Sequence, residues 1–235
     1  MKLEGTFHKA KFLSRPNRFL SYINLENNNG KQAAHVPDPG RLKELLIPGA
    51  EVIVRQEQQV NRKTKYSLVG VKKDDVWVNI DSIFTNTIFK EEFNKIDNFL
   101  DYKILRSEYT FGNSRFDFLL ENLKTKRRAL VEVKGVTLVE NGLALFPDAP
   151  TTRGTKHVKE LAKALKHDFE SYIVFVVKRP NATSFKPNKE TDYKFTEALI
   201  NASKAGVKII VVKCSYEPII KKEISIISKL EYSFH

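Results

Sequence analysis

Two apolar runs that each carry one acid constrain the fold of this chain more than any other feature. A polar turn separates the runs, which cover residues 114–120 and 130–134. In an extended strand alternate side chains share a face, so Glu132 and Lys134 point the same way, about 6.6 Å apart. If the two runs pair as a hairpin, Asp117 meets Glu132 and Lys134 at one edge of a sheet.

Two carboxylates and one ammonium group at such an edge suit phosphodiester chemistry. Carboxylate oxygens hold Mg²⁺, which is usually bound by one or two acids together with substrate phosphate. Mn²⁺ is the alternative ion. The metal offsets charge on the phosphodiester, and the amine orients or polarises the attacking water. This arrangement resembles the PD-(D/E)xK nucleases, with Asp117 and Glu132 as metal ligands and Lys134 beside the water.

The acid-x-Lys triplet alone is not specific. The same pattern occurs at 101–103 and 192–194, in a chain that is rich in lysine. What separates 132–134 is its β-branched setting and the second acid-bearing run upstream. The alternative is that Glu132 and Lys134 are solvent-facing charges on an amphipathic strand.

Composition favours a polyanionic partner. Lys and Arg outnumber Asp and Glu by 40 to 28, a net charge of +12, which indicates nucleic acid or an anionic membrane. No stretch approaches 18 apolar residues, and the start lacks the apolar core of a signal peptide, so we expect a soluble, cytoplasmic protein. The single Cys214 follows an apolar run, which favours a buried structural thiol.

Residues 1–81 read as a small all-β domain. Alternating segments predict strands at 6–13, 19–25, 32–36, 51–56, 65–71 and 76–80, with a short helix over 41–46. This order predicts an OB-like β-barrel that binds nucleic acid, and an SH3-like barrel would give nearly the same pattern.

Basic and aromatic residues of this half are candidates for DNA binding. Together they suit backbone tracking and base stacking, and Arg41 lies where a helix N-terminus would favour a phosphate. The alternative is that the aromatic residues, including Phe19, belong to the core and the arginines only solvate loops. The candidates are Arg15, Arg18, Arg41, Lys63, Lys65 and Tyr66.

Residues 82–235 form the second predicted domain. A helical connector over 82–102 leads into the two acid-bearing runs. A helix around 158–165, a strand at 172–177, a helix over 191–205 and a strand at 207–212 follow. This order predicts a restriction-endonuclease-like α/β domain, with a mixed central sheet covered by helices on both faces. The stretch 219–235 either adds an edge strand or stays loose.

Further polar residues lie near the predicted site. Arg153, Lys156 and His157 stand at a helix start, where cations are unfavourable unless an anion such as phosphate binds there. We therefore place Arg153 and Lys156 on DNA and His157 near the scissile group; the alternative is ordinary solvated charges. Glu108 is a candidate third carboxylate in the catalytic set, and Arg115 a candidate phosphate contact.

Several motifs spread over nearly the whole chain resemble the SfsA family (sugar fermentation stimulation protein A). In the first half they are residues 15–19, 35–41 and 48–49, and in the second half 107–108, 114–118, 132–134, 136–138, 146–149, 153–154 and 157. The resemblance implies an OB-type domain, a nuclease-like domain and nonspecific DNA binding, with a regulatory link to sugar (maltose) metabolism. Asp38 stands where many relatives have Asn.

Two functions follow from these features. The first is a nonspecific DNA-binding protein with a Mg²⁺-dependent phosphodiesterase, that is, an endonuclease or exonuclease site. The second is a DNA-binding regulator of sugar metabolism without catalysis, which predicts affinity that falls steeply with salt. DNA, single- or double-stranded, is the expected partner, RNA stays open because OB domains bind either polymer, and no motif indicates a membrane partner.

Overall fold

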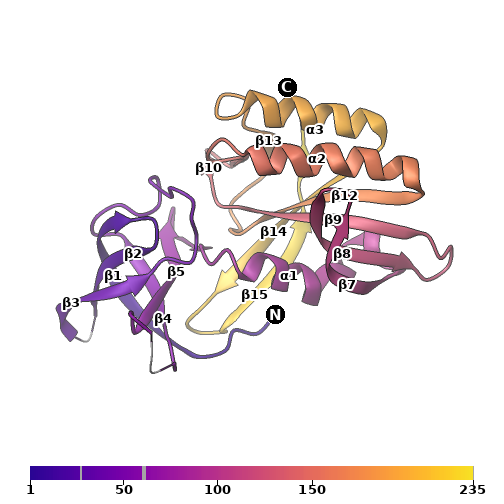
Figure 1. The fold of residues 1–235 in the computed structure, drawn as a ribbon. Coiled ribbons are helices and arrows are strands. Elements are labelled where there is room, and N and C mark those ends of the chain that lie inside the picture. The colour runs from indigo at the N-terminus through magenta and orange to yellow at the C-terminus, as the bar shows by residue number, and fades with distance from the viewer. Residues whose placement is uncertain (27, 60–61, 235) are drawn as a thin grey trace.

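The computed structural model describes residues 1–26, 28–59 and 62–234. Six strands form its N-terminal sheet (Figure 1): β1 (Thr6–Asn17), β2 (Leu20–Leu25), β3 (Asn28–His35), β4 (Glu51–Gln56), β5 (Tyr66–Lys73) and β6 (Val76–Asn79). Their order is β3-β2-β1-β4-β5-β6, and a parallel pairing of β3 with β5 closes β1 to β5 into a ring. This five-stranded topology is that of the predicted OB domain.

The β3–β4 connection contributes leucines to the core inside this ring. The sequence predicts one or two helical turns over 41–46, and the structure has one turn there, which does not extend into a helix. The segment is a single turn, in which the amides of Leu45 and Leu46 both donate to the carbonyl of Leu42. Pro-Gly pairs bound the segment on both sides, and Leu42 has a positive φ of 49°. Too few residues remain to propagate a helix beyond its unfavourable first turn.

The predicted helical connector is present. It consists of α1 (Phe84–Glu92) and two 3₁₀ turns, η1 (Phe93–Lys95) and η2 (Asp97–Phe99). Apolar side chains at helical spacing, such as Ile88 and Phe89, are fully buried in the core of the second domain. The helix therefore forms because it covers one face of the following sheet.

Six strands form the C-terminal sheet: β7 (Tyr102–Phe111), β8 (Ser114–Asn122), β9 (Arg128–Val136), β12 (Phe169–Val177), β14 (Lys208–Glu217) and β15 (Glu223–Lys229). Their order is β15-β14-β12-β9-β8-β7. The strands β9, β12 and β14 are parallel neighbours, and antiparallel strands flank them. The predicted mixed sheet is confirmed, and the last stretch of the chain supplies its edge strand β15.

Alternate residues of β9 pack on opposite faces of this sheet. Val131 and Val133 join the core under α1, whereas Leu130 and Val136 join the core under α2 (Thr152–Ala164) and α3 (Tyr193–Ala205). Figure 1 shows α2 and α3 on one side of the sheet and α1 on the other. The side chains of Glu132 and Lys134 therefore leave β9 on the face of the sheet that α2 covers. A small third sheet contains β10 (Val139–Glu140), β11 (Leu143–Phe146), β13 (Ser184–Pro187) and β16 (Glu231–Tyr232).

Cys214 on β14 is buried in the core under α1. Burial raises the pKa of its thiol to about 12, which agrees with the structural thiol that the sequence predicts. In the described ranges, no helix combines the length and the apolar character that crossing a membrane requires.

Buried contacts join the two large sheets. The hydroxyl of Tyr216 on β14 donates to the carbonyl of Val69 on β5 at 3.4 Å. Arg179, which is 1% exposed, forms an ion pair with Asp74 at 2.9 Å. Leu3 packs in the core of the C-terminal sheet, so the chain start lies across the predicted boundary at residue 81. These contacts fix the position of the N-terminal loops beside the C-terminal site.

A substitution at Gly70 tests the contact between the two large sheets. A Cβ at Gly70 would lie 2.8 Å from a ring carbon of Tyr216, so we expect Gly70→Ala to lower the free energy of unfolding by about 1–3 kcal/mol through overpacking. Gly30→Ala is the matched control, because among the described residues the nearest atom to its Cβ would be a side-chain nitrogen at 3.8 Å. Urea denaturation of the full chain measures both variants, and equal stability of Gly70→Ala and wild type would contradict the tight contact.

Candidate metal and phosphate site

The site begins where the β8–β9 ladder ends. The last ladder pair is Phe118 with Val131, and one step further Asp117 and Glu132 would face each other across the two strands. Instead, the Asp117 carboxylate accepts the backbone amide of Val133 at 2.7 Å. A side chain thus replaces the carbonyl that would continue the ladder. This substitution holds Asp117 at the opening between the strands.

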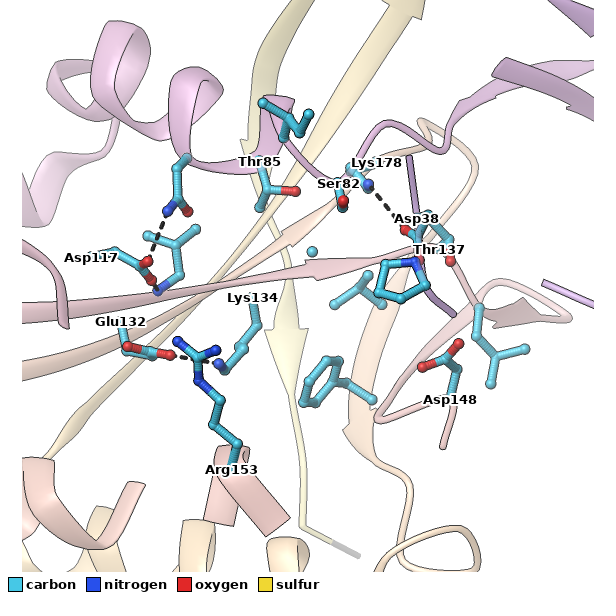
Figure 2. A pocket seen from close by; sticks show the side chains of 18 of the residues that line it. Asp38, Ser82, Thr85, Asp117, Glu132, Lys134, Thr137, Asp148, Arg153 and Lys178 are labelled. Atoms are coloured by element: carbon cyan, nitrogen blue, oxygen red, sulfur yellow. Dashed lines mark hydrogen bonds and ion pairs between the residues drawn. The ribbon is translucent and has the colours of Figure 1, made fainter. Parts of the chain in front are cut away.

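A cavity of about 710 Å³ lies at this opening. Asp117, Glu132, Lys134 and Arg153 line one end of it, which is the left side of Figure 2. The other end is lined by residues of both large domains, among them Asp38, Thr137, Asp148 and Lys178. The structure therefore gathers the predicted acids, the lysine and one predicted phosphate-binding arginine around one space.

Glu132 is the most constrained of these side chains. It is 2% exposed, and its Oε1 accepts hydrogen bonds from Lys134 Nζ at 2.5 Å and from His157 Nδ1 at 2.6 Å. Burial alone would raise the pKa of Glu132, but the His157 hydrogen bond and the Lys134 charge outweigh it, so the pKa lies below the usual range. Glu132 is consequently a carboxylate, and its Oε2 is buried without a hydrogen-bond partner in the part of the chain that the structure describes.

Asp117 is held from the opposite face of the sheet. Its second oxygen accepts a hydrogen bond from Asn86 of α1 at 2.7 Å. Burial, together with the nearby negative charge of Glu132, raises the pKa of Asp117. The site thus keeps two carboxylates close enough to repel each other, which costs stability when both are ionised.

These features fit a divalent cation. An uncompensated carboxylate oxygen on Glu132 and a second acid facing the same cavity are the ligands that Mg²⁺ prefers. Within residues 1–26, 28–59 and 62–234, no group of three or more His, Cys, Asp and Glu side chains could hold a metal. Asp117 and Glu132 are the acids at this end of the cavity that could hold the ion.

The structure places two further candidates differently from the sequence interpretation. Glu108 is exposed, has a positive φ of 56°, pairs with Arg115 at 3.5 Å and does not line the cavity. His157 is buried behind Glu132, and its other ring nitrogen lies 3.5 Å from Arg153 Nε. His157 therefore orients Glu132 and does not reach into the cavity as a donor.

The predicted DNA-binding arginines of the N-terminal domain gather in one place. Arg15 donates four hydrogen bonds to backbone carbonyls, including those of Asp38 and Gly40, and so fixes the loop beside the cavity. Arg18 and Arg41 are exposed and line a shallow depression next to Arg15. Of the three, Arg18 and Arg41 are the ones available to a ligand.

The remaining basic candidates are not part of this group. Lys63 and Lys65 are exposed on the β4–β5 connection, and neither lines the cavity or the arginine depression. Tyr66 is 6% exposed and belongs to the core inside the ring, as the alternative interpretation held. Lys156 donates to the carbonyl of Asn113 at 2.6 Å and thus ties α2 to the β7–β8 turn.

Sequence reasoning missed Asn86 and Lys178. The helical spacing of 82–102 identifies the buried apolar face of α1, but it gives no sign that Asn86 reaches Asp117. Lys178 follows a continuous apolar strand, where a lysine reads as the first solvated residue, yet it is 1% exposed. Both roles depend on how separate elements pack, which no local pattern records.

Comparison with known proteins gives consistent matches. A family model described as "Sugar fermentation stimulation protein RE domain" matches residues 82–219, and one described as "SfsA N-terminal OB domain" matches residues 13–80. A "Sugar fermentation stimulation protein homolog" from Clostridium acetobutylicum is 43% identical over 219 residues, 92% of this chain and 94% of the relative. One from Clostridium tetani is 40% identical over 232 residues, 97% and 100% of the two chains.

A solved structure, that of Pyrococcus furiosus SfsA in complex with Ca²⁺, is similar over 100% of both chains. Its TM-score is 0.88 and its sequence identity is 31%. The likeness therefore extends through both domains, including the strands that carry the site.

The repulsion between the two acids leads to a testable prediction. Because the pKa of Asp117 is raised in the folded state, its ionisation destabilises the fold increasingly as pH rises from the unfolded pKa, near 4, through the folded pKa. We expect Asp117→Asn to raise the free energy of unfolding at pH 7 by about 0.5–2 kcal/mol and to lose this advantage below pH ~4.

Urea denaturation at both pH values measures the effect. Asp75→Asn is the control, since the Asp75 side chain is 99% exposed and its removal should change little at either pH. A destabilised Asp117→Asn at pH 7 would contradict the repulsion.

Proposed function

The chain belongs to the SfsA family, and from this premise we propose that it binds DNA without sequence specificity and hydrolyses phosphodiester bonds with Mg²⁺ or Mn²⁺. The observation that carries the proposal is the buried Oε2 of Glu132, which has no hydrogen-bond partner among the described residues, on a side chain that lines the same cavity as Asp117. A buried acceptor of this kind is costly unless a ligand satisfies it. A cation at that point satisfies it and offsets the repulsion between the acids.

Asp117 and Glu132 would hold the ion. When bound, the ion supplies charge stabilisation of the phosphodiester and lowers the pKa of a water. The Pyrococcus furiosus relative was solved in complex with Ca²⁺, which supports a divalent-cation site in this chain as well.

The other side chains have separable tasks. Asn86 and His157 orient the two carboxylates from opposite faces of the sheet. Lys134 Nζ forms an ion pair with Glu132 Oε1 in this structure, and it is the ammonium group that would orient the attacking water. Arg153 is exposed at the start of α2 and lines the cavity, so it would contact the phosphate.

DNA would approach along the basic side of the cavity. The net charge of +12 and the exposed Arg18 and Arg41, on the loops beside Asp38, support a phosphate track into the site. Such contacts carry no sequence information, which agrees with nonspecific binding. RNA is the alternative polymer that the same surface would accept.

One observation favours a second function, a DNA-binding regulator of sugar (maltose) metabolism without catalysis. The third acid predicted for the catalytic set, Glu108, pairs with Arg115 outside the cavity, so two of the three predicted acids, Asp117 and Glu132, line it. The relatives' description as sugar fermentation stimulation protein homologs supports a regulatory link. In that case the cavity would serve DNA binding alone.

Metal-dependent cleavage separates the two functions. We expect the wild type to cut plasmid or single-stranded DNA with Mg²⁺ or Mn²⁺, Glu132→Gln to lose at least about 10²-fold in rate, and His157→Ala to weaken metal affinity by about 10–100-fold. Gel electrophoresis measures products, and isothermal titration calorimetry measures metal binding.

Glu121→Gln is the matched control for these variants. Glu121 lies on β8 like Asp117 but pairs with Lys103 away from the cavity, so its rate should equal that of the wild type. Identical background cleavage by wild type and Glu132→Gln with both metals, while DNA binding persists, would leave the regulator as the function.

Salt dependence tests the DNA track. We expect the double variant Arg18→Ala/Arg41→Ala to bind DNA more weakly and to reduce the slope of log affinity against log salt by about 1–2, through fewer released counterions. Lys166→Ala/Lys204→Ala is the control, because it removes the same charge from exposed sites that line neither the cavity nor the arginine depression. Equal slopes for the two double variants would place the DNA elsewhere.

A further inference from the structure

The end of the cavity away from Glu132 is not explained by phosphodiester chemistry. Asp38 from the N-terminal domain and Asp148 from the C-terminal domain both line it (Figure 2). Carboxylates repel a phosphate backbone, so they suit a ligand group that brings hydrogen-bond donors. The DNA group that carries such donors is the base.

The two carboxylates converge on one point. A Cβ at Gly40 would lie 2.8 Å from Asp38 Oδ1 and 2.9 Å from Asp148 Oδ2. Asp38 Oδ1 accepts the amide of Gly40 at 2.7 Å, which leaves the other oxygen of Asp38 toward Lys178. Only a residue without a side chain allows the two loops to meet in this way.

A buried lysine lies beside these acids. Lys178 is 1% exposed, its Nζ lies 3.3 Å from the carbonyl of Asp81 and 4.0 Å from Asp38 Oδ2, and it lines the cavity. Both contacts are long, so the side-chain amino group of Lys178 can still donate a hydrogen bond to another acceptor. Pro39 and Phe146 also line the cavity and provide apolar surface.

We propose that this end of the cavity takes the base of one unpaired nucleotide, with guanine as the preferred base. The inference rests on the proposed function and deepens it. Guanine presents two adjacent donors, N1–H and the 2-amino group, for a carboxylate, and O6 as an acceptor for Lys178. Thymine has no amino group and one ring donor, so it matches these partners least. Pro39 and Phe146 would contact the face of the ring.

The two ends of the cavity are joined by a short stretch of chain. Lys134, at the phosphate end, lies on β9, and Thr137, at the other end, directly follows the strand, so the two residues are at most about 10 Å apart along the chain. This is about the span from the phosphate of a nucleotide to the far edge of its base. A paired base cannot present this edge, so the nucleotide must be single-stranded or turned out of the duplex.

Fluorescence anisotropy in EDTA tests the inference without cleavage. The probes are short duplexes that carry one unpaired guanine, adenine, cytosine or thymine, and the fully paired duplex. For the wild type we expect about tenfold tighter binding with unpaired guanine than with unpaired thymine, and the weakest binding for the paired duplex. We expect Asp148→Asn to reduce the guanine preference to less than about twofold, while Asp75→Asn keeps it.

The outcomes distinguish this inference from the proposed function. Equal affinity of the wild type for all five duplexes would overturn base recognition, even if Mg²⁺-dependent cleavage occurs and the proposed function stands. Guanine preference that persists in Asp148→Asn would also overturn it. A guanine preference in EDTA, together with no cleavage by the wild type in the separate assay with Mg²⁺ or Mn²⁺, would support the base site and remove the catalytic proposal.

Discussion

The structure of the site depends on one hydrogen bond, from the backbone amide of Val133 to the carboxylate of Asp117. It ends the ladder between β8 and β9 one step before the two acids would pair across it. An amide left without a partner in the sheet would be costly, and the carboxylate removes that cost while it stays at the opening. The same bond therefore satisfies the backbone amide and positions the Asp117 carboxylate at the cavity.

Keeping two acids at that opening determines what the surrounding elements must supply. Glu132 needs donors, and α2 provides His157 from one face while the strand itself provides Lys134. Asp117 needs a second donor, and α1 provides Asn86 from the other face. A sheet covered on only one side could not do both. The layered α/β architecture is thus a requirement of the site, because each carboxylate is oriented from its own side.

The sequence predicted the central part of this arrangement because strand periodicity is local. Alternation alone put Glu132 and Lys134 on one face, and the upstream run put Asp117 on the neighbouring strand. It failed where one residue leaves the regular pattern: Glu108 has a positive φ, and Leu42 turns the chain where a helix was expected. Tyr66 illustrates a different limit, since a strand aromatic faces core or solvent according to a ring closure that its own segment does not encode.

The energetic cost of the site is an argument about its use. Buried charges are often replaceable by apolar side chains with no loss, or a gain, in stability. Glu132 nevertheless keeps one carboxylate oxygen buried with no hydrogen-bond partner among residues 1–26, 28–59 and 62–234, beside a second acid whose pKa is raised. A buried acceptor without a partner calls for an explanation, and an unseen ion or water is the usual one. Asp117 and Glu132 line the same cavity as Asp38 of the N-terminal domain, so the docking of the two domains shapes the space in front of both acids.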